Sequence, residues 1–351
     1  MTVQPYAIIR DEPIATETPK DIAPIRQFAR TPTNVLMATK FAPLNVVVDG
    51  YLYEGFSVLA GRQKLGKTWL AIDWSVSVAA GGCAMGSIPC DAGDVLYIDL
   101  ENGQRRIQSR IAALFPDERA RPDLNRLLWM TSAPEVNAGL IGELDKWRQS
   151  VADPRLVVID VLQRIKPPGK FGRNAYENDY SIWAPLQEWA TRYRIAVLGL
   201  HHTRKGGADD PLEALSGSNG LSACADTTIV LDSHQNGKTL YVRGRDVTER
   251  ETAITFVGNQ WTILGEAAAV RTSGERAVIV QALRDNREPM TPSDLAAALG
   301  KPTNNIKQLL YKMAKAAPPE VHRVGKGRYS LEPLPPDNPD NRNNRVQGDD
   351  E

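Results

Sequence analysis

The sequence has little of several features that would mark a specialised class of protein. It holds three cysteines, Cys83, Cys90 and Cys224, in 351 residues. An odd number without a Cys-x-x-Cys pair gives neither a disulfide framework nor a zinc site, and it favours a reducing compartment. No run approaches the ~20 apolar residues of a membrane span, and the acidic, proline-containing stretch 11–13 does not fit a signal peptide. We therefore expect a cytoplasmic protein without membrane contact.

Charge of either sign is not in excess. Lys and Arg number 42, as do Asp and Glu, so the formal net charge is zero. The total therefore gives no sign of a polyanionic partner, although local basic clusters can still contact one. A hydrophobic content of 42% is enough to bury a core, and the length predicts one large domain with a smaller one.

Between residues 43 and 268, short β-rich runs alternate with helical stretches. The runs are FSVLAG, DVLYIDL, RLLWMT, RLVVID, RIAVLGLHHT and DTTIVLDS. Such alternation predicts an α/β fold with a mostly parallel sheet flanked by helices. Two later runs, KTLYVRGRDV and ETAITFVGNQWTIL, have only polar connectors between them. We expect these two to pair antiparallel at one edge of the sheet.

The flanking segments differ from this core in composition. Residues 1–42 mix Pro, Thr and charge and predict a flexible arm, while residues 332–351 have almost nothing to bury and predict a disordered tail. Residues 274–331 show three helical stretches and then RVGKGRYSLE, a pattern that predicts a small winged helix-turn-helix domain. Such modules bind duplex DNA or protein. The side chains expected to contact duplex DNA are Asn304, Asn305, Lys307, Gln308, Lys312, Lys326 and Arg328.

The strongest motif is a phosphate-binding loop, GRQKLGKT at residues 61–68. It follows the β-run FSVLA and precedes the helical WLAIDWSVSVAA, which is the context of a P-loop. Its glycines let successive N–H groups face phosphates, Lys67 reaches the β- and γ-phosphates, and the Thr68 hydroxyl binds Mg²⁺. The motif therefore predicts ATP with Mg²⁺. The residues predicted to bind the nucleotide are Gly61, Arg62, Gln63, Lys64, Leu65, Gly66, Lys67, Thr68 and Trp69.

Three further strand ends carry polar side chains that would meet this nucleotide. Asp160 ends the run LVVID, where it is predicted to bind Mg²⁺, and Val161 follows it, so a tandem acidic pair is missing. Glu101 follows DVLYIDL and is the candidate general base, with a helix N-cap as the alternative. His201 and His202 end IAVLGL as candidate sensors of the γ-phosphate. The sequence does not choose between the two histidines.

Two arginines offer a further catalytic group. Arg243 and Arg245 lie two apart in the run LYVRGRDV, so a strand would project both from one face. They form either surface ion pairs or an arginine finger, which enters the ATP site of a neighbouring subunit.

Together these motifs resemble the RepA-type hexameric helicases of plasmids and phages, which are P-loop ATPases of the RecA/DnaB-like superfamily. The matching pieces are LAGRQKLGKTWLA, VLYIDLENGQRRIQSRI, LVVIDVL and LGLHHTRKGG. The resemblance implies a RecA-like domain and a homo-hexameric ring with ATP between subunits and single-stranded DNA in its centre. It also implies that Glu101 is the base, that Asp160 binds the metal, and that residues 206–220 form a DNA loop next to Arg204 and Lys205.

Two functions follow from these patterns. The first is a ring-shaped replicative helicase that hydrolyses Mg-ATP to unwind DNA. The second is a DNA-tethered regulatory or loader ATPase without processive unwinding. A RecA- or KaiC-like recombination or regulatory ATPase would share the same core. A P-loop kinase would need an acceptor pocket and lid arginines, and no motif supplies them.

Overall fold

The computed structural model describes residues 30–168, 175–203, 219–234, 237–286, 288–325 and 327–333. The chain divides after Pro43 into two units, Met1–Pro43 and Leu44–Glu351. In the first unit, helix α1 spans Thr33–Ala38 and has no buried side chain. Most of the predicted arm, nearly all of the candidate DNA loop 206–220, Lys326 and most of the predicted tail lie outside the described residues. The predicted domain limits remain predictions.

A nine-stranded sheet forms the centre of the second unit, in the order β13-β12-β11-β10-β3-β9-β8-β6-β7. The strands from β10 to β7 in this order run parallel to their neighbours, as the alternating runs predict. One strand, β9, separates β3 from β8. The parallel strands are β3 (Gly55–Gly61), β6 (Asp94–Asp99), β7 (Leu127–Met130), β8 (Pro154–Asp160), β9 (Ala196–His202) and β10 (Thr227–His234).

The antiparallel edge expected from the two later runs is present, but it contains three strands. They are β11 (Gly237–Gly244), β12 (Arg250–Val257) and β13 (Gln260–Glu266). The run ETAITFVGNQWTIL forms a hairpin, because Gly258 and Asn259 adopt φ values of 58° and 67° between the paired strands. Two central residues with positive φ make the tight turn that matches the twist of a hairpin.

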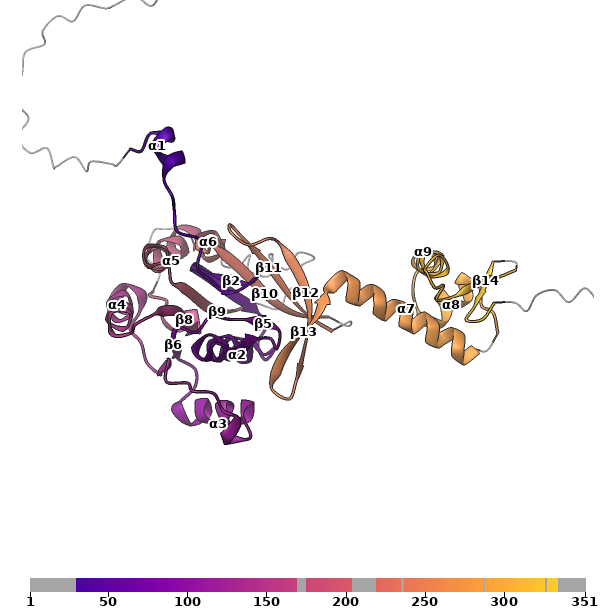
Figure 1. The fold of residues 1–351 in the computed structure, drawn as a ribbon, viewed down its shortest axis with the longest axis horizontal. Coiled ribbons are helices and arrows are strands. Elements are labelled where there is room, and N and C mark those ends of the chain that lie inside the picture. Colours follow the sequence, from indigo (N-terminus) through magenta and orange to yellow (C-terminus); the bar gives the residue numbers. More distant parts are fainter. Residues whose placement is uncertain are drawn as a thin grey trace, which may run out of the picture. The chain divides into compact units, whose positions relative to one another are not determined.

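Helices cover both faces of the sheet (Figure 1). Strand side chains alternate between the faces, so Leu198 packs on the side of α2 and Val197 on the side of α5. Burial on both faces explains why the strands are almost continuously apolar. Helices α2 (Lys67–Ala80) and α3 (Gln104–Leu114) lie on one face, and α4 (Leu140–Ser150), α5 (Ala175–Tyr193) and α6 (Asn219–Cys224) on the other.

Several short elements complete the second unit. The short strands are β1 (Val46–Val48), β2 (Leu52–Tyr53), β4 (Cys83–Ala84) and β5 (Ile88–Pro89). The 3₁₀ turns are η1 (Glu118–Ala120), η2 (Val136–Ala138) and η3 (Leu162–Arg164). None of the described helices is long and apolar enough to cross a membrane.

The C-terminal segment forms three helices and a two-stranded hairpin around its own core, which includes Ile279, Leu295, Ile306 and Leu310. Its first helix begins at Ala267, directly after β13, whereas the sequence periodicity predicts a start at residue 274. Three consecutive alanines favour this earlier start. The elements are α7 (Ala267–Asn286), α8 (Pro292–Leu299), α9 (Thr303–Ala314), β14 (His322–Val324) and β15 (Arg328–Ser330).

Candidate nucleotide site

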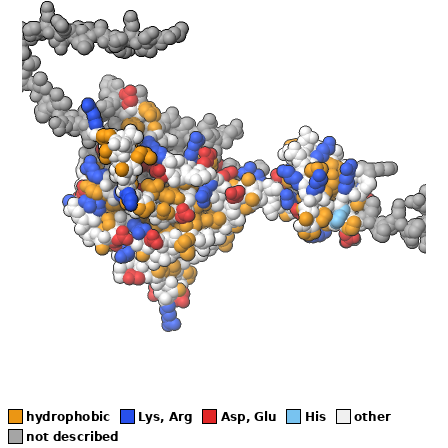
Figure 2. Space-filling view, turned by 45° about the horizontal axis from the view of Figure 1, so that its top comes forward, with side chains coloured by type: hydrophobic (Ala, Val, Ile, Leu, Met, Phe, Trp, Pro, Cys, Tyr) orange, Lys and Arg blue, Asp and Glu red, His pale blue; other side chains and the backbone are white. Residues whose placement is uncertain are grey.

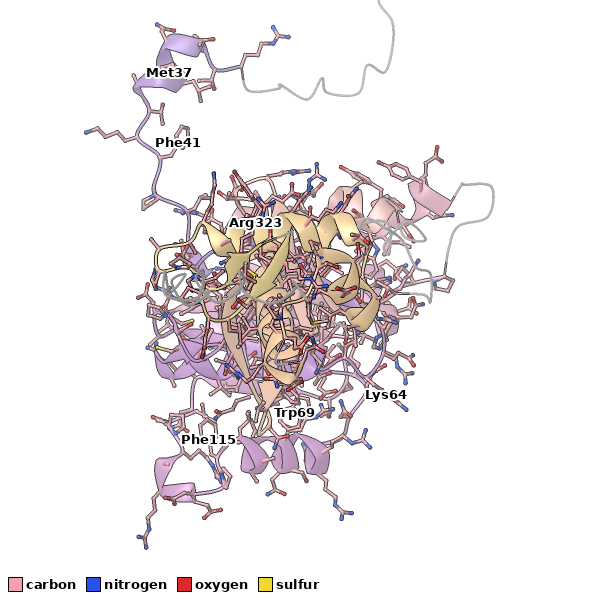
Figure 3. All side chains as sticks on the ribbon, turned by 90° about the vertical axis from the view of Figure 1, so that its right-hand side faces the viewer. Met37, Phe41, Lys64, Trp69, Phe115 and Arg323 are labelled. Carbon is pink, nitrogen blue, oxygen red and sulfur yellow. The ribbon has the colours of Figure 1, made fainter. Side chains whose placement is uncertain are left out.

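The phosphate loop joins β3 to α2, and its two glycines are required by both conformation and packing. Gly61 has φ 155° and Gly66 has φ 106°, a region of backbone space that favours glycine. A Cβ atom on Gly61 would lie 2.4 Å from the Leu231 carbonyl oxygen, and one on Gly66 would lie 2.7 Å from a ring carbon of Trp261. Lys64, between the glycines, is exposed and points outward (Figure 3).

Lys67 folds back into this loop and is 4% exposed. Its Nζ donates to the carbonyl oxygens of Gly61 at 2.7 Å and Arg62 at 2.9 Å, and it lies 3.0 Å from Nδ1 of His202. Burial lowers the pKa of Lys67 to about 8, although two nearby carboxylates oppose this shift. The loop therefore encloses a cation at the position that the motif assigns to phosphate binding.

Asp160 ends β8 and is 1% exposed. Its carboxylate accepts hydrogen bonds from the hydroxyls of Thr68 and Tyr97, the latter at 3.1 Å. Burial raises the pKa of Asp160 to about 6, and the two hydroxyls oppose this shift. Sequence reasoning missed Tyr97, because its contact with Asp160 joins strands far apart in the sequence.

The donor set at Thr68 and Asp160 fits Mg²⁺, which prefers hydroxyl and carboxylate oxygens and usually keeps several waters. The Thr68–Asp160 hydrogen bond shows that both donors lie at one place. Among the residues that the structure describes, no group of three His, Cys, Asp or Glu side chains is arranged to hold a metal. A metal at Thr68 and Asp160 would therefore take its remaining ligands from water and phosphate.

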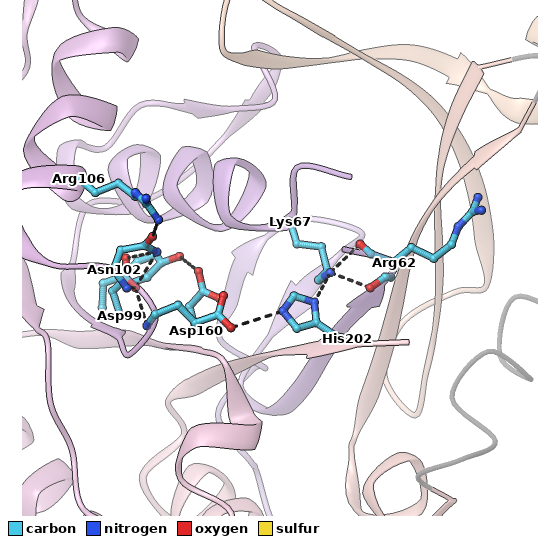
Figure 4. A network of polar contacts seen from close by, with 10 residues as sticks. Arg62, Lys67, Asp99, Asn102, Arg106, Asp160 and His202 are labelled. Carbon is cyan, nitrogen blue, oxygen red and sulfur yellow. Dashed lines mark hydrogen bonds and ion pairs between the residues drawn. The ribbon is translucent and has the colours of Figure 1, made fainter. Parts of the chain in front are cut away.

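Glu101 follows β6, and its side chain is 40% exposed. Its Oε1 lies 3.7 Å from Nε2 of His202, so His202 stands between Glu101 and Lys67. Figure 4 shows His202 beside Lys67. Burial and the charge of Lys67 lower the pKa of His202. A neutral ring that accepts from the Lys67 ammonium at Nδ1 carries its proton at Nε2, which faces Glu101.

The two histidines face opposite sides of the sheet, because side chains alternate along a strand. His202 lies on the α2 side, as Leu200 does, and His201 lies on the α5 side, as Val197 does. Burial lowers the pKa of His201 to about 4, with the charges of His202 and Lys166 acting in the same direction. The structure therefore places His202, rather than His201, at the phosphate loop.

A pair of matched variants tests this difference. His202→Asn is expected to lower kcat for ATP by about tenfold to a hundredfold, since it removes the ring between Lys67 and Glu101. His201→Asn changes a side chain on the other face and is expected to leave basal kcat within about threefold. Steady-state turnover at saturating ATP measures both. A larger loss in His201→Asn would contradict this placement.

The loop after β6 excludes the N-cap interpretation of Glu101. Helix α3 begins at Gln104 with Gly103 as its N-cap, and no side chain caps it. The side-chain amide of Asn102 instead donates to the two carboxylate oxygens of Asp99 at 2.9 and 3.1 Å. Glu101 is therefore not engaged with the end of the helix.

The two candidate arginines do not share one strand. β11 ends at Gly244, so Arg245 lies beyond it, which corrects the expectation that both project from one strand face. Arg245 Nη1 lies 3.0 Å from Oδ1 of Asp226. Arg243 Nε lies 3.6 Å from Oε2 of Glu249, and both of these side chains are more than half exposed, at 58% and 55%.

Together, fold and site define the class of protein. A mostly parallel sheet covered by helices, a phosphate loop after one strand and a buried aspartate at the end of the next strand but one are the parts of a P-loop ATPase. A family described as "AAA domain" matches residues 23–208, which is more than half of the chain. The protein belongs to this AAA-domain family and is an ATP-binding P-loop ATPase.

Two solved structures are similar to the chain. One is described as an ATPase domain, with a TM-score of 0.47 and 17% identity over 60% of this chain and 85% of that one. The other is described as "The Structure Of A DnaB-Like Replicative Helicase And Its Interactions With Primase", with a TM-score of 0.49 and 16% identity over 66% of each chain. A comparison with curated proteins gives no match.

Proposed function

We propose that the chain is the subunit of a hexameric ring that hydrolyses Mg-ATP to move along and unwind DNA, like the replicative helicases that its motifs resemble. The observation that carries the hydrolytic part is the contact series Lys67, His202 and Glu101. It links the phosphate loop, which follows β3, to a carboxylate that follows β6, although β9 and β8 lie between these two strands. The proposed phosphate-binding residue, sensor and base therefore lie next to one another within a single chain.

Each of these side chains has a distinct task in hydrolysis. The Glu101 carboxylate takes a proton from the attacking water, whose oxygen bonds to the γ-phosphorus as the bond to ADP breaks. When nucleotide binds, the Lys67 ammonium exchanges its contacts with the Gly61 carbonyl and His202 for phosphate oxygens. His202 is then free to contact the γ-phosphate. Thr68 and Asp160 would hold Mg²⁺, which would offset the negative charge that develops on the phosphate groups.

Arg243 is the better candidate for the arginine finger. Arg245 is held by Asp226, a carboxylate that also accepts from the backbone N–H of Phe56 at 2.9 Å. The pairing of Arg243 with Glu249 is longer, and its carboxylate is 55% exposed against 14% for Asp226. Exposed pairs contribute about 0–1 kcal/mol. Arg243 is therefore the easier of the two to transfer to a neighbouring subunit.

Subunit mixing tests this assignment. Arg243→Gln is expected to lose about a thousandfold in ATP turnover while still binding nucleotide, because a finger acts on the transition state. Mixed with Lys67→Ala subunits, it should regain part of that turnover, since some interfaces combine an intact loop with an intact arginine. Arg245→Gln serves as the comparison and should chiefly lower thermal stability. Mixtures that stay inactive would contradict a finger acting between subunits.

The C-terminal segment is the proposed duplex-binding module, a winged helix-turn-helix. Helix α9 buries Ile306, Leu310 and Met313, while Lys307 and Lys312 are exposed. Figure 2 shows lysine and arginine side chains gathered on the visible face of this segment. Asn304, Asn305, Gln308 and Arg328 are also exposed and complete the described part of the proposed contact surface.

One observation favours the second function, a DNA-tethered regulatory or loader ATPase. Trp261 of β13 packs against Gly66 of the phosphate loop, and β13 continues directly into α7 of the C-terminal segment. A conformational change in the phosphate loop would thus displace Trp261 and the strand that leads into the proposed DNA-binding module. In this alternative, hydrolysis times the release of DNA or of a partner and does not separate strands.

Separation of a labelled forked duplex by the purified full chain distinguishes the two functions. The helicase predicts strand release with Mg-ATP, none with a non-hydrolysed analogue, and none in Glu101→Gln. Tight duplex binding and ATP turnover without any strand release would favour the regulatory ATPase.

A further inference from the structure

The loop that carries Glu101 is held by a buried carboxylate for which the nucleotide chemistry described above has no use. Asp99 ends β6, is 0% exposed, and pairs in register with Asp160 on the neighbouring strand β8. Its hydrogen bonds go to the loop that follows β6. We propose that Asp99, paired with Arg110, is a positioning residue that sets the place of Glu101 for hydrolysis, an inference that rests on the proposed role of Glu101 as the base.

Asp99 binds the loop by hydrogen bonds that reach the backbone of Glu101 itself. Its Oδ1 accepts from the backbone N–H of Glu101 at 3.2 Å and of Asn102 at 2.9 Å, in addition to the Asn102 amide. The Oδ1 of Asn102 in turn accepts from Arg106 of α3 at 2.8 Å (Figure 4). These contacts fix the backbone of Glu101 and Asn102, the second and third residues after the strand. The starting point of the Glu101 side chain is therefore defined.

Arg110 supplies the opposite charge and a link to the phosphate-loop helix. Its Nη1 lies 3.7 Å from Oδ2 of Asp99 and makes no hydrogen bond although it is buried. Its guanidinium carbon lies 5.9 Å from the ring centre of Trp69, which faces α3 in Figure 3 and directly follows Thr68 in sequence. Arg110 therefore joins the Glu101 loop to the helix that carries Lys67 and Thr68.

The contacts of Asp99 and Arg110 keep the base at a fixed distance from the phosphate-binding residues. The base and the phosphate-binding residues come from different strands, and a displacement of the base by about 1 Å can cost about a hundredfold in rate. A buried carboxylate with defined donors keeps its geometry better than an exposed loop does, because leaving those donors or the charge unpaired is costly. The Glu101 side chain is 40% exposed, so its position depends on the backbone that Asp99 holds.

Three variants of the full chain test the proposal by their kcat and KM for ATP, affinity for a fluorescent ATP analogue, and melting temperature. Asp99→Asn is expected to lower kcat about tenfold to a hundredfold, with KM and affinity within about threefold, since only the base is displaced. Arg110→Met should lower kcat about tenfold and Arg110→Lys should recover part of it. Arg105→Met, an exposed arginine of the same helix, is the control and should leave kcat unchanged.

The double variant Asp99→Asn with Arg110→Met should lose little more than Asp99→Asn alone, because both act through one contact. Wild-type kcat in folded Asp99→Asn, or losses that multiply in the double variant, would overturn the proposal. If Asp99→Asn does not fold, wild-type kcat in folded Arg110→Met overturns it instead. Turnover retained in Glu101→Gln would reject the base itself, whereas an inactive Glu101→Gln beside a fully active Asp99→Asn rejects only the positioning role.

Discussion

Replacement of Lys67 by alanine is expected to abolish ATP hydrolysis and to weaken nucleotide binding about a thousandfold. The ammonium lies inside the phosphate loop, where a charge pair at 4 Å is worth about 4 kcal/mol at an effective dielectric constant near 20, or roughly a thousandfold in affinity. Titration with a fluorescent nucleotide and steady-state turnover measure the two effects.

Lys64→Ala is the matched control for this experiment. Lys64 is predicted to contribute to the loop through its backbone N–H, which alanine keeps, and its side chain is exposed and points outward. Its affinity and turnover are expected to stay within a few-fold of wild type. Turnover within tenfold of wild type in Lys67→Ala would contradict the assignment of the loop to phosphate.

Glu101→Gln is expected to reduce kcat by about a hundredfold to ten-thousandfold while nucleotide affinity stays within a few-fold of wild type. The substitution keeps the shape of the side chain but removes the carboxylate that accepts the proton of the attacking water. The side chain is 40% exposed and is not a helix cap, so little stability should be lost. Normal turnover by this variant would show that the base lies elsewhere.

The phosphate loop and the strands around it can be predicted from the sequence, because the patterns that mark them lie within short stretches of the chain. The GRQKLGKT motif sits between an apolar run and a helical run, and its glycines occur where the structure demands positive φ. The ends of β8 and β9 coincide with the polar residues Asp160 and His202 that close their apolar runs, whereas β6 ends at Asp99, two residues before Glu101. Parallel strands then bring these ends to one edge of the sheet.

The contacts that hold the site residues in place cannot be predicted from the sequence, because they depend on the order of the strands and on the register of the helices. Nothing local shows that Tyr97 donates to Asp160, or that Arg110, on the following helix, reaches back to Asp99. The alternation of β9 separates His201 from His202, but the sequence does not show which face carries the phosphate loop. The Gly258-Asn259 turn was hidden inside an apparently continuous strand.

The proposed function requires that DNA stimulates ATP turnover in a ring of these chains. The most direct test measures ATP hydrolysis by the purified protein with and without single-stranded DNA, together with its mass in solution with a non-hydrolysed ATP analogue. Strong stimulation by DNA and a hexamer-sized species are predicted. Turnover that is indifferent to DNA, in a monomer or dimer, would contradict the ring motor and favour the regulatory ATPase.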